Sequence, residues 1–143
     1  MILVADSGST KTDWIYFDQE SSSETLSTVG INPLFHNESY IENAIKENKS
    51  LFLIQNKITH IYYFGAGCSE KNRNKIVENG LKSVFKNAKI IVEHDLMGAA
   101  LAACQGKPGI ACILGTGSNS CYFDGENLIE KTPSLGYILG DEG

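Results

Sequence analysis

The chain has 143 residues, of which 42% are hydrophobic and 20% are charged, and its 12 basic and 17 acidic residues give a formal net charge of −5. This composition is typical of a globular chain and excludes a disordered or fibrous one. The acidic balance argues against nucleic acid as a partner, and no apolar stretch approaches the roughly 18 residues of a membrane span. No secretion signal is visible, so we expect a cytoplasmic protein without a membrane partner.

The first thirty residues predict a three-stranded antiparallel meander. An apolar run at 2–5 ends at Asp6, and a glycine- and serine-rich turn leads into the aromatic and β-branched run at 12–17. A third strand is expected at 25–29, just before Gly30.

Strands then alternate with helices. Apolar residues at helical spacing predict a helix over about 38–52 and another after Ser69 and Glu70. Compact apolar runs predict strands at 60–64 and 89–93, and a buried helix is expected over about 96–104. This order predicts an α/β fold with a mixed sheet, in which parallel strands follow the meander and helices cover both faces.

A second hairpin, at 110–123, repeats the pattern of the first. We therefore expect a first lobe at 1–108 and the opening hairpins of a second lobe at 109–143. The strand edges of the second lobe should remain unpaired unless further sequence or a partner covers them.

The four cysteines show no C-x-x-C spacing, which predicts reduced, packed thiols of a cytosolic protein rather than disulfides. They are Cys68, Cys104, Cys112 and Cys121.

Two turns have the composition of anion-binding loops. In the first, DSGSTKT, a carboxylate ends a strand and small residues let backbone N–H groups approach a phosphate. In the second, GTGSN, glycines again separate two strands. Two such turns, one opening each lobe, predict a phosphate chain held from both sides. Each turn taken alone also suits an ordinary hairpin.

Asp95 stands between a predicted strand and an apolar helix. One role for it is to cap that helix. The other is a general base that accepts a proton from a substrate hydroxyl, because open α/β sheets bind ligands at the carboxyl ends of their strands.

Together these segments resemble the sugar-kinase, hexokinase and actin superfamily, and within it the N-acetylglucosamine kinases and their relatives in the BadF/BadG/BcrA/BcrD ATPase group. DSGSTKTDW and ILGTGSNS are similar to the two phosphate motifs of this group, LGYILGDEG to its GDEGS signature and EHDLMGAALAA to the segment of its catalytic aspartate. The resemblance implies a ribonuclease H-like first lobe and ATP-dependent transfer of phosphate to the 6-hydroxyl of an amino sugar, most of all N-acetylglucosamine.

The resemblance also implies roles for particular residues. Asp95 would be the catalytic base and would contact the sugar, and Asp6 would help to place Mg²⁺. The residues expected to bind ATP are Asp6, Gly8, Ser9, Thr10, Lys11, Gly115, Thr116 and Gly117. Those expected to line the sugar site are Asn32, Ser118, Asn119, Gly136, Tyr137 and Asp141.

Two departures from the animal enzymes fall in the segments expected to bind sugar. Leu135-Gly136-Tyr137 replaces a Trp-Gly-His run, and Pro33 replaces a histidine after Asn32. A dehydratase-activator-like ATPase and a non-catalytic sugar-sensing module remain alternatives. In the kinase reading, the 143 residues alone would be inactive, and the full-length enzyme would act as a homodimer.

Overall fold

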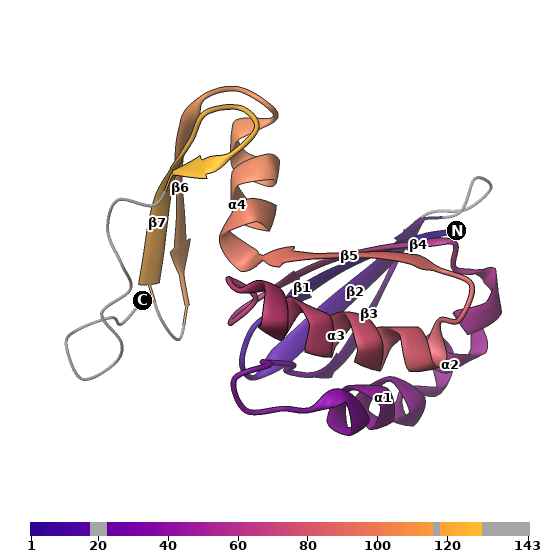
Figure 1. The fold of residues 1–143 in the computed structure, drawn as a ribbon. Helices are drawn as coiled ribbons and strands as arrows, with labels where there is room; N and C mark the ends of the chain where they lie inside the picture. The colour runs from indigo at the N-terminus through magenta and orange to yellow at the C-terminus, as the bar shows by residue number, and fades with distance from the viewer. Residues whose placement is uncertain (18–22, 116–117, 130–143) are drawn as a thin grey trace. The chain divides into compact units, whose positions relative to one another are not determined.

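The computed structural model describes residues 1–17, 23–115 and 118–129 (Figure 1). The chain forms two compact units, Met1–Asp95 and Leu96–Gly143. The lobes expected at 1–108 and 109–143 remain a prediction for the whole protein.

A five-stranded mixed sheet forms the centre of the first unit. Its strands are β1 (Ile2–Ser7), β2 (Lys11–Phe17), β3 (Glu24–Val29), β4 (His60–Gly65) and β5 (Lys89–His94). They lie in the order β3-β2-β1-β4-β5. The strands β1, β2 and β3 are antiparallel neighbours, whereas β4 runs parallel to β1 and β5 runs parallel to β4. This sheet confirms the predicted α/β fold with parallel strands after an antiparallel meander. Helices were expected on both faces, but the three helices that the structure describes in this unit share one core on a single face of the sheet. Because parallel strands share a direction, β1, β4 and β5 end at the same edge.

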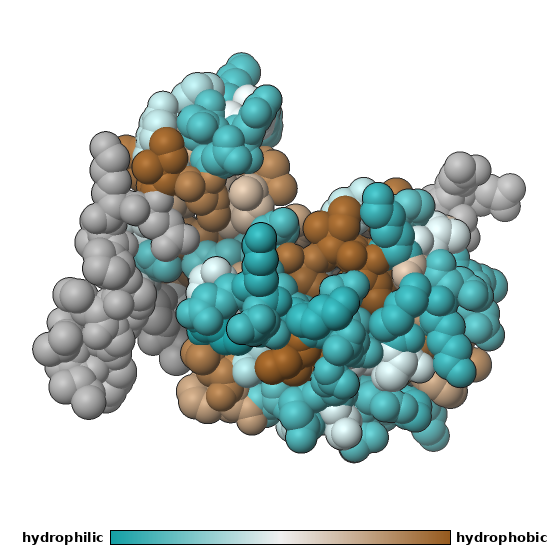
Figure 2. All heavy atoms as spheres, in the orientation of Figure 1, coloured by the Kyte–Doolittle hydropathy of each residue, from teal (hydrophilic) through white to brown (hydrophobic). Residues whose placement is uncertain are grey.

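The helices of this unit are α1 (Glu38–Glu47), α2 (Lys49–Leu53) and α3 (Lys71–Val84), with a 3₁₀ turn at Gln55–Lys57. Alternate residues along the strands are buried, and they meet the apolar stripes of α1 and α3 in one core. The fully buried core side chains include Leu3, Trp14, Ile41, Ile45, Ile61, Tyr63, Val77 and Leu81. Each large apolar side chain contributes about 1.5–3 kcal/mol by leaving water. The outward surfaces of α1 and α3 are mostly polar (Figure 2).

The helix predicted over 38–52 is divided at Asn48. This residue is extended, with φ −83° and ψ 96°, and its side chain accepts a hydrogen bond from Leu51 N–H, so it caps α2. Asparagine favours such a cap because its short amide competes with helical hydrogen bonding. Periodicity alone did not reveal the break, since apolar residues continue across it.

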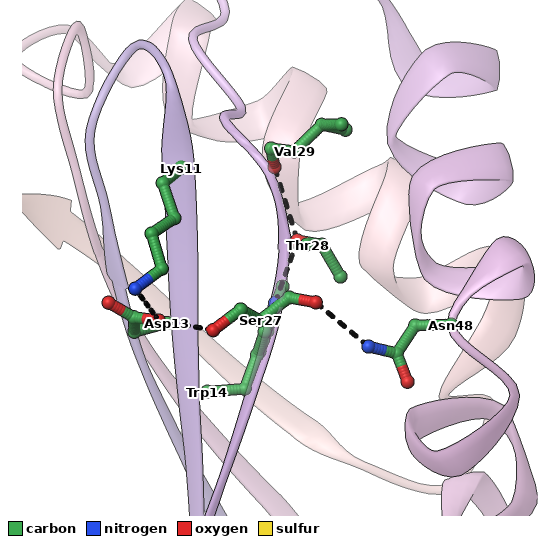
Figure 3. Close-up of polar contacts among 7 residues, drawn as sticks. All are labelled: Lys11, Asp13, Trp14, Ser27, Thr28, Val29 and Asn48. Carbon is green, nitrogen blue, oxygen red and sulfur yellow. Dashed lines mark hydrogen bonds and ion pairs between the residues drawn. The ribbon is translucent and has the colours of Figure 1, made fainter.

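Polar contacts join β2, β3 and the start of α2 (Figure 3). The Lys11 ammonium lies 2.9 Å from Asp13 Oδ1, which also accepts a hydrogen bond from Ser27 Oγ at 2.6 Å. Trp14 Nε1 donates to Thr28 Oγ1 at 2.9 Å, and Asn48 Nδ2 donates to the Ser27 carbonyl at 2.9 Å. The outer strand β3 is therefore held by side chains as well as by its ladder to β2.

The second unit contains most of α4 (Asp95–Cys104) and a three-stranded antiparallel sheet of β6 (Gly109–Leu114), β7 (Ser118–Phe123) and β8 (Leu128–Ile129). Its small core consists of Leu96, Ala100, Ala111, Cys121 and Phe123. The hairpin at 110–123 was predicted, but the two-residue strand β8 was not. Among the described residues β6 is an edge strand, and Ile110 and Leu114 on it are 74% and 79% exposed. This fits the expectation of an uncovered strand edge.

All four cysteines are free thiols. Cys68 and Cys121 are buried and Cys104 is half-buried, but Cys112 is exposed, so the expectation of packing is wrong for this residue. No helix in the described ranges combines the length and apolar character needed to cross a membrane.

Candidate active site

The first anion-type turn connects β1 to β2 at the carboxyl edge of the sheet. Gly8 N–H donates to the Lys11 carbonyl at 2.9 Å, which closes the turn, and the four residues from Gly8 to Lys11 are exposed. The turn can therefore present main-chain donors to an anion, as its composition predicted. The side chain of Lys11 points along β2 toward Asp13 in this structure (Figure 3).

Asp6 lies beside this turn, opposite Asp13 in the β1–β2 ladder. Asp6 remains accessible to solvent. Its pKa is nevertheless raised above the ordinary value of 3.8, mainly by partial burial and then by the negative charges of Asp95 and Asp13. The structure thus brings together Asp6 and Asp95, two carboxylates that are 89 positions apart in the sequence.

Asp95 follows β5 and is the first residue of α4. Its side chain is 24% exposed, and Oδ1 lies 3.2 Å from Nε2 of His94. The preceding strands place it at the edge where β1 and β4 also end. A half-buried carboxylate at this edge remains reachable by a substrate, which is what a general base requires.

Asn32 is held against the first turn. Its Nδ2 donates to Ser9 Oγ at 3.3 Å, its Oδ1 accepts from Leu34 N–H at 3.0 Å, and its backbone N–H donates to His36 Nδ1 at 3.1 Å. Asn32 is only 5% exposed. A carboxamide has two donors and two acceptor sites, so one of each remains after these contacts.

The loop after β4 packs against the same asparagine. Gly67 has φ +79°, and a Cβ atom at this position would lie 2.4 Å from Asn32 Oδ1. Glycine is needed here both for the left-handed backbone and for the close approach. The segments after β1, β3 and β4 therefore meet around Asn32, although they are distant in the sequence.

Cys68 follows in this loop and was not among the predicted site residues. Burial raises the pKa of its thiol to about 12, the charge of Asp95 adds to this, and Arg73 acts in the opposite direction. A thiol with this pKa stays protonated near neutral pH and is a poor nucleophile or metal ligand. Cys68 is therefore part of the apolar core of the first unit, and its position after the Gly65-Ala66-Gly67 run is the sequence signal that could have drawn attention to it.

The second anion-type turn lies in the second unit, between β6 and β7. Gly115 is exposed, and Ser118 and Asn119 begin β7, where Asn119 Oδ1 accepts a hydrogen bond from Ser120 N–H at 2.8 Å. The other predicted site residues lie outside the described residues; they are Thr116, Gly117, Gly136, Tyr137 and Asp141.

Within residues 1–17, 23–115 and 118–129, no three histidine, cysteine, aspartate or glutamate side chains gather so that they could hold a metal ion. A magnesium ion that arrives with a nucleotide needs only one or two protein carboxylates, because phosphates and water supply its remaining ligands. Asp6 has a raised pKa and negatively charged neighbours, so its carboxylate suits a cation whose remaining ligands come from phosphates and water.

The chain is similar to several solved structures and to a curated relative. The chain aligns over 99% of its length with a provisionally assigned N-acetylglucosamine kinase of Porphyromonas gingivalis, at 41% identity and a TM-score of 0.90. It is also 32% identical over 78 residues to an N-acetylmuramic acid/N-acetylglucosamine kinase of Clostridium acetobutylicum, a match that covers 54% of this chain and 26% of that protein. No model of a protein family matches the chain.

Two further structures share the fold at lower identity. A provisionally assigned sugar kinase of Cytophaga hutchinsonii has a TM-score of 0.64 at 19% identity, with 98% of this chain and 53% of the other covered. An inorganic polyphosphate/ATP-glucomannokinase of an Arthrobacter species has a TM-score of 0.57 at 16% identity, with coverages of 92% and 61%. The chain spans half the length of the P. gingivalis protein. The resemblance predicted from the sequence is therefore confirmed: this chain is similar to the N-acetylglucosamine kinases and has the fold of the sugar kinases.

Proposed function

We propose that the full-length protein is a sugar kinase that transfers the γ-phosphoryl group of ATP to the 6-hydroxyl of an amino sugar, with N-acetylglucosamine as its main substrate. The observation that carries this proposal is the 41% identity to the P. gingivalis protein over 99% of the chain. The name of the C. acetobutylicum relative supports the same substrate class and adds N-acetylmuramic acid to it.

Asp95 is the general base in this proposal. A sugar hydroxyl is a weak nucleophile at neutral pH, so a carboxylate near the reacting oxygen is needed to accept its proton as the bond to phosphorus forms. The half-buried position of Asp95 at the end of β5, and the response of both Asp6 and Cys68 to its charge, support this role.

Main-chain groups bind the phosphates. The chain is acidic overall, so the exposed turn offers the N–H groups and hydroxyls of Ser9 and Thr10 in place of a basic surface, while Gly8 N–H closes the turn on the Lys11 carbonyl. Lys11 adds a positive charge at the end of this turn, where Asp13 now pairs with it. Gly115, Thr116 and Gly117 are the residues of the second unit that we propose for the same role.

Asp6 would hold the magnesium ion that accompanies ATP. Partial burial and neighbouring carboxylates make its ionised form costly, and a cation offsets that cost. Bound there, Mg²⁺ would neutralise negative charge on the phosphates.

The amino sugar contacts Asn32 through the donor and acceptor that its internal hydrogen bonds leave available. The other residues that we propose for sugar binding, as the resemblance implies, are Ser118, Asn119, Gly136, Tyr137 and Asp141. Bringing the two lobes together around both substrates would exclude water and suppress hydrolysis of ATP.

ADP release measured across a panel of sugars tests the proposal. With the full-length protein, ATP and Mg²⁺, we expect release to depend on N-acetylglucosamine or N-acetylmuramic acid and to be far slower with glucose or no sugar. Strong ATPase activity that no sugar alters would refute the kinase proposal. Iron in anaerobically purified protein would then identify the activator-like alternative, whose cluster needs cysteine ligands.

A further inference from the structure

A buried hydrogen-bond network lies directly beneath Asn32. The Ile31 carbonyl accepts one hydrogen bond from Tyr63 Oη at 3.1 Å and another from Ser7 Oγ at 3.1 Å. Ile31 N–H donates to Ser7 Oγ at 3.3 Å, and Ser7 Oγ also lies 2.6 Å from Thr12 Oγ1. Ser7, Thr12, Ile31 and Tyr63 are all fully buried. The backbone of Ile31 is thus held at its N–H and at its carbonyl.

The donors and acceptors in this network balance. If Ser7 donates its single proton to the Ile31 carbonyl, Thr12 donates to Ser7, and the two lone pairs of Ser7 accept from Thr12 and from Ile31 N–H. Tyr63 then supplies the second donor to the carbonyl. Burial raises the pKa of the Tyr63 hydroxyl, so this group remains a donor at every physiological pH.

The position of Tyr63 is itself fixed. Its ring packs against Trp14 with centroids 6.0 Å apart, and it passes so close to Gly65 that a Cβ atom there would lie 2.5 Å from the ring. Because the Tyr63 ring has little freedom, its hydroxyl has a fixed position, and the hydrogen bond that it donates fixes the orientation of the Ile31 carbonyl. Ile31 precedes Asn32, so its peptide plane sets the starting direction of the asparagine backbone.

We propose that Tyr63 is a positioning residue for the sugar site, acting on Asn32 through the Ile31 carbonyl. This inference rests on the proposed function, because it requires Asn32 to contact the sugar. Among the described residues, the Tyr63 hydroxyl donates to the Ile31 carbonyl and interacts with Ser7 at the start of the phosphate turn, but it has no hydrogen bond to residues 8–11 or to Asp95. Its loss should therefore affect the binding of sugar more than the binding of ATP.

Tyr63→Phe in the full-length protein removes the hydroxyl and keeps the ring. The Ile31 carbonyl would retain Ser7 as a donor, so the fold should persist while the Asn32 segment gains freedom. The loss of one buried hydrogen bond predicts an increase of about 3- to 10-fold in KM for N-acetylglucosamine, with KM for ATP changed less than about 2-fold.

Tyr16→Phe is the matched control, because Tyr16 Oη donates to Glu24 Oε2 at 2.6 Å near the opposite end of the sheet. This variant should leave both KM values unchanged. Differential scanning fluorimetry of both variants, with and without N-acetylglucosamine, should show a smaller sugar-induced rise in Tm for Tyr63→Phe than for Tyr16→Phe.

The outcomes separate the two proposals. If the unmodified protein shows no sugar-dependent release of ADP, the proposed function fails and the role of Tyr63 fails with it. If the unmodified protein is active but Tyr63→Phe keeps its KM for sugar, only the positioning role is refuted. An equal rise in both KM values would also refute it, since that result indicates a general loosening of the unit.

Discussion

Two aspartates at the same sheet edge have different surroundings. The negative charges of Asp95 and Asp13 help to raise the pKa of Asp6, whereas the Asp95 carboxylate lies beside the His94 imidazole. Paired acidic groups with distinct environments are a common basis for dividing roles in a site. In the proposed function, Asp6 would hold the metal and Asp95 would accept the substrate proton.

Asp95→Asn tests this assignment. In the full-length protein, turnover should fall about 10²- to 10⁴-fold, because the amide cannot accept the sugar proton. Sugar affinity, measured by calorimetry, should change by less than about 3-fold. Glu93→Gln, which alters an exposed carboxylate on the same strand, is the control and should keep normal turnover. Retained turnover in the Asp95 variant would reject the base assignment.

Asp6 and Asp13 should affect stability in opposite directions. The folded-state pKa of Asp6 is raised, so its ionised form destabilises the fold as pH rises through that pKa. The folded-state pKa of Asp13 is lowered, first by the hydrogen bond from Ser27 and then by Lys11, so its contribution is present above its ordinary pKa and is lost in acid.

Asp6→Asn should therefore raise Tm at pH 7. The corresponding gain in the free energy of unfolding should be less than about 1 kcal/mol, because the carboxylate is partly exposed. The gain should shrink as pH falls through the folded-state pKa. Asp13→Asn should lower Tm at pH 7 instead. Thermal unfolding followed by the fluorescence of Trp14, the single tryptophan, measures both. A Tm change of the same sign in the two variants would contradict the assigned surroundings.

The residues to which we assign chemistry could be proposed from the sequence, but the residues that support them could not. Asp6, Asp95 and the glycine turns stand in recognisable local patterns. Tyr63 and Cys68 sit in an apolar run and after a glycine loop, where each reads as ordinary core. Their significance comes from the hydrogen bond of Tyr63 to Ile31 and from the effect of the Asp95 charge on the pKa of Cys68, and both partners are far away in the sequence. Local sequence patterns do not predict contacts between residues that are far apart in the chain.

At the scale of elements, Asn48 joins two parts of the first unit. It caps α2 through Oδ1 and ties α2 to β3 through Nδ2 (Figure 3). Asn48→Ala should lower the free energy of unfolding by about 1–2 kcal/mol, since both the cap and the bond to the Ser27 carbonyl are lost.

Urea unfolding of the chain, again followed by Trp14 fluorescence, measures this change. Asn48→Asp keeps the capping oxygen but loses the donor to Ser27, so it should be destabilised by less than the alanine variant. Equal losses in the two variants would show that the cap contributes nothing.

The predicted helices and strands agree with the structure where the apolar residues follow a single clear spacing. Alternating burial made β1 and β4 readable, and the apolar stripe did the same for α3. The break at Asn48 was missed because one polar cap does not interrupt a hydrophobic stripe. The strand β8 was missed because two residues, Leu128 and Ile129, carry no periodicity and pair only through the turn that begins at Asp124.

At the scale of the whole molecule, the chain corresponds to half the length of the P. gingivalis protein. The exposed apolar side chains of Ile110 and Leu114 on the edge strand β6 suit a surface that further chain or a partner covers. The net charge of −5 fits phosphate binding through turns and a magnesium ion rather than through a basic surface.

The identity of the product tests the central claim most directly. The full-length protein is incubated with ATP, Mg²⁺ and N-acetylglucosamine, and the products are resolved by phosphorus NMR with proton coupling. We predict a sugar monophosphate whose phosphorus couples to the two protons on C6, formed in equal amount with ADP. ADP that accumulates with inorganic phosphate and without any phosphorylated sugar would contradict the claim.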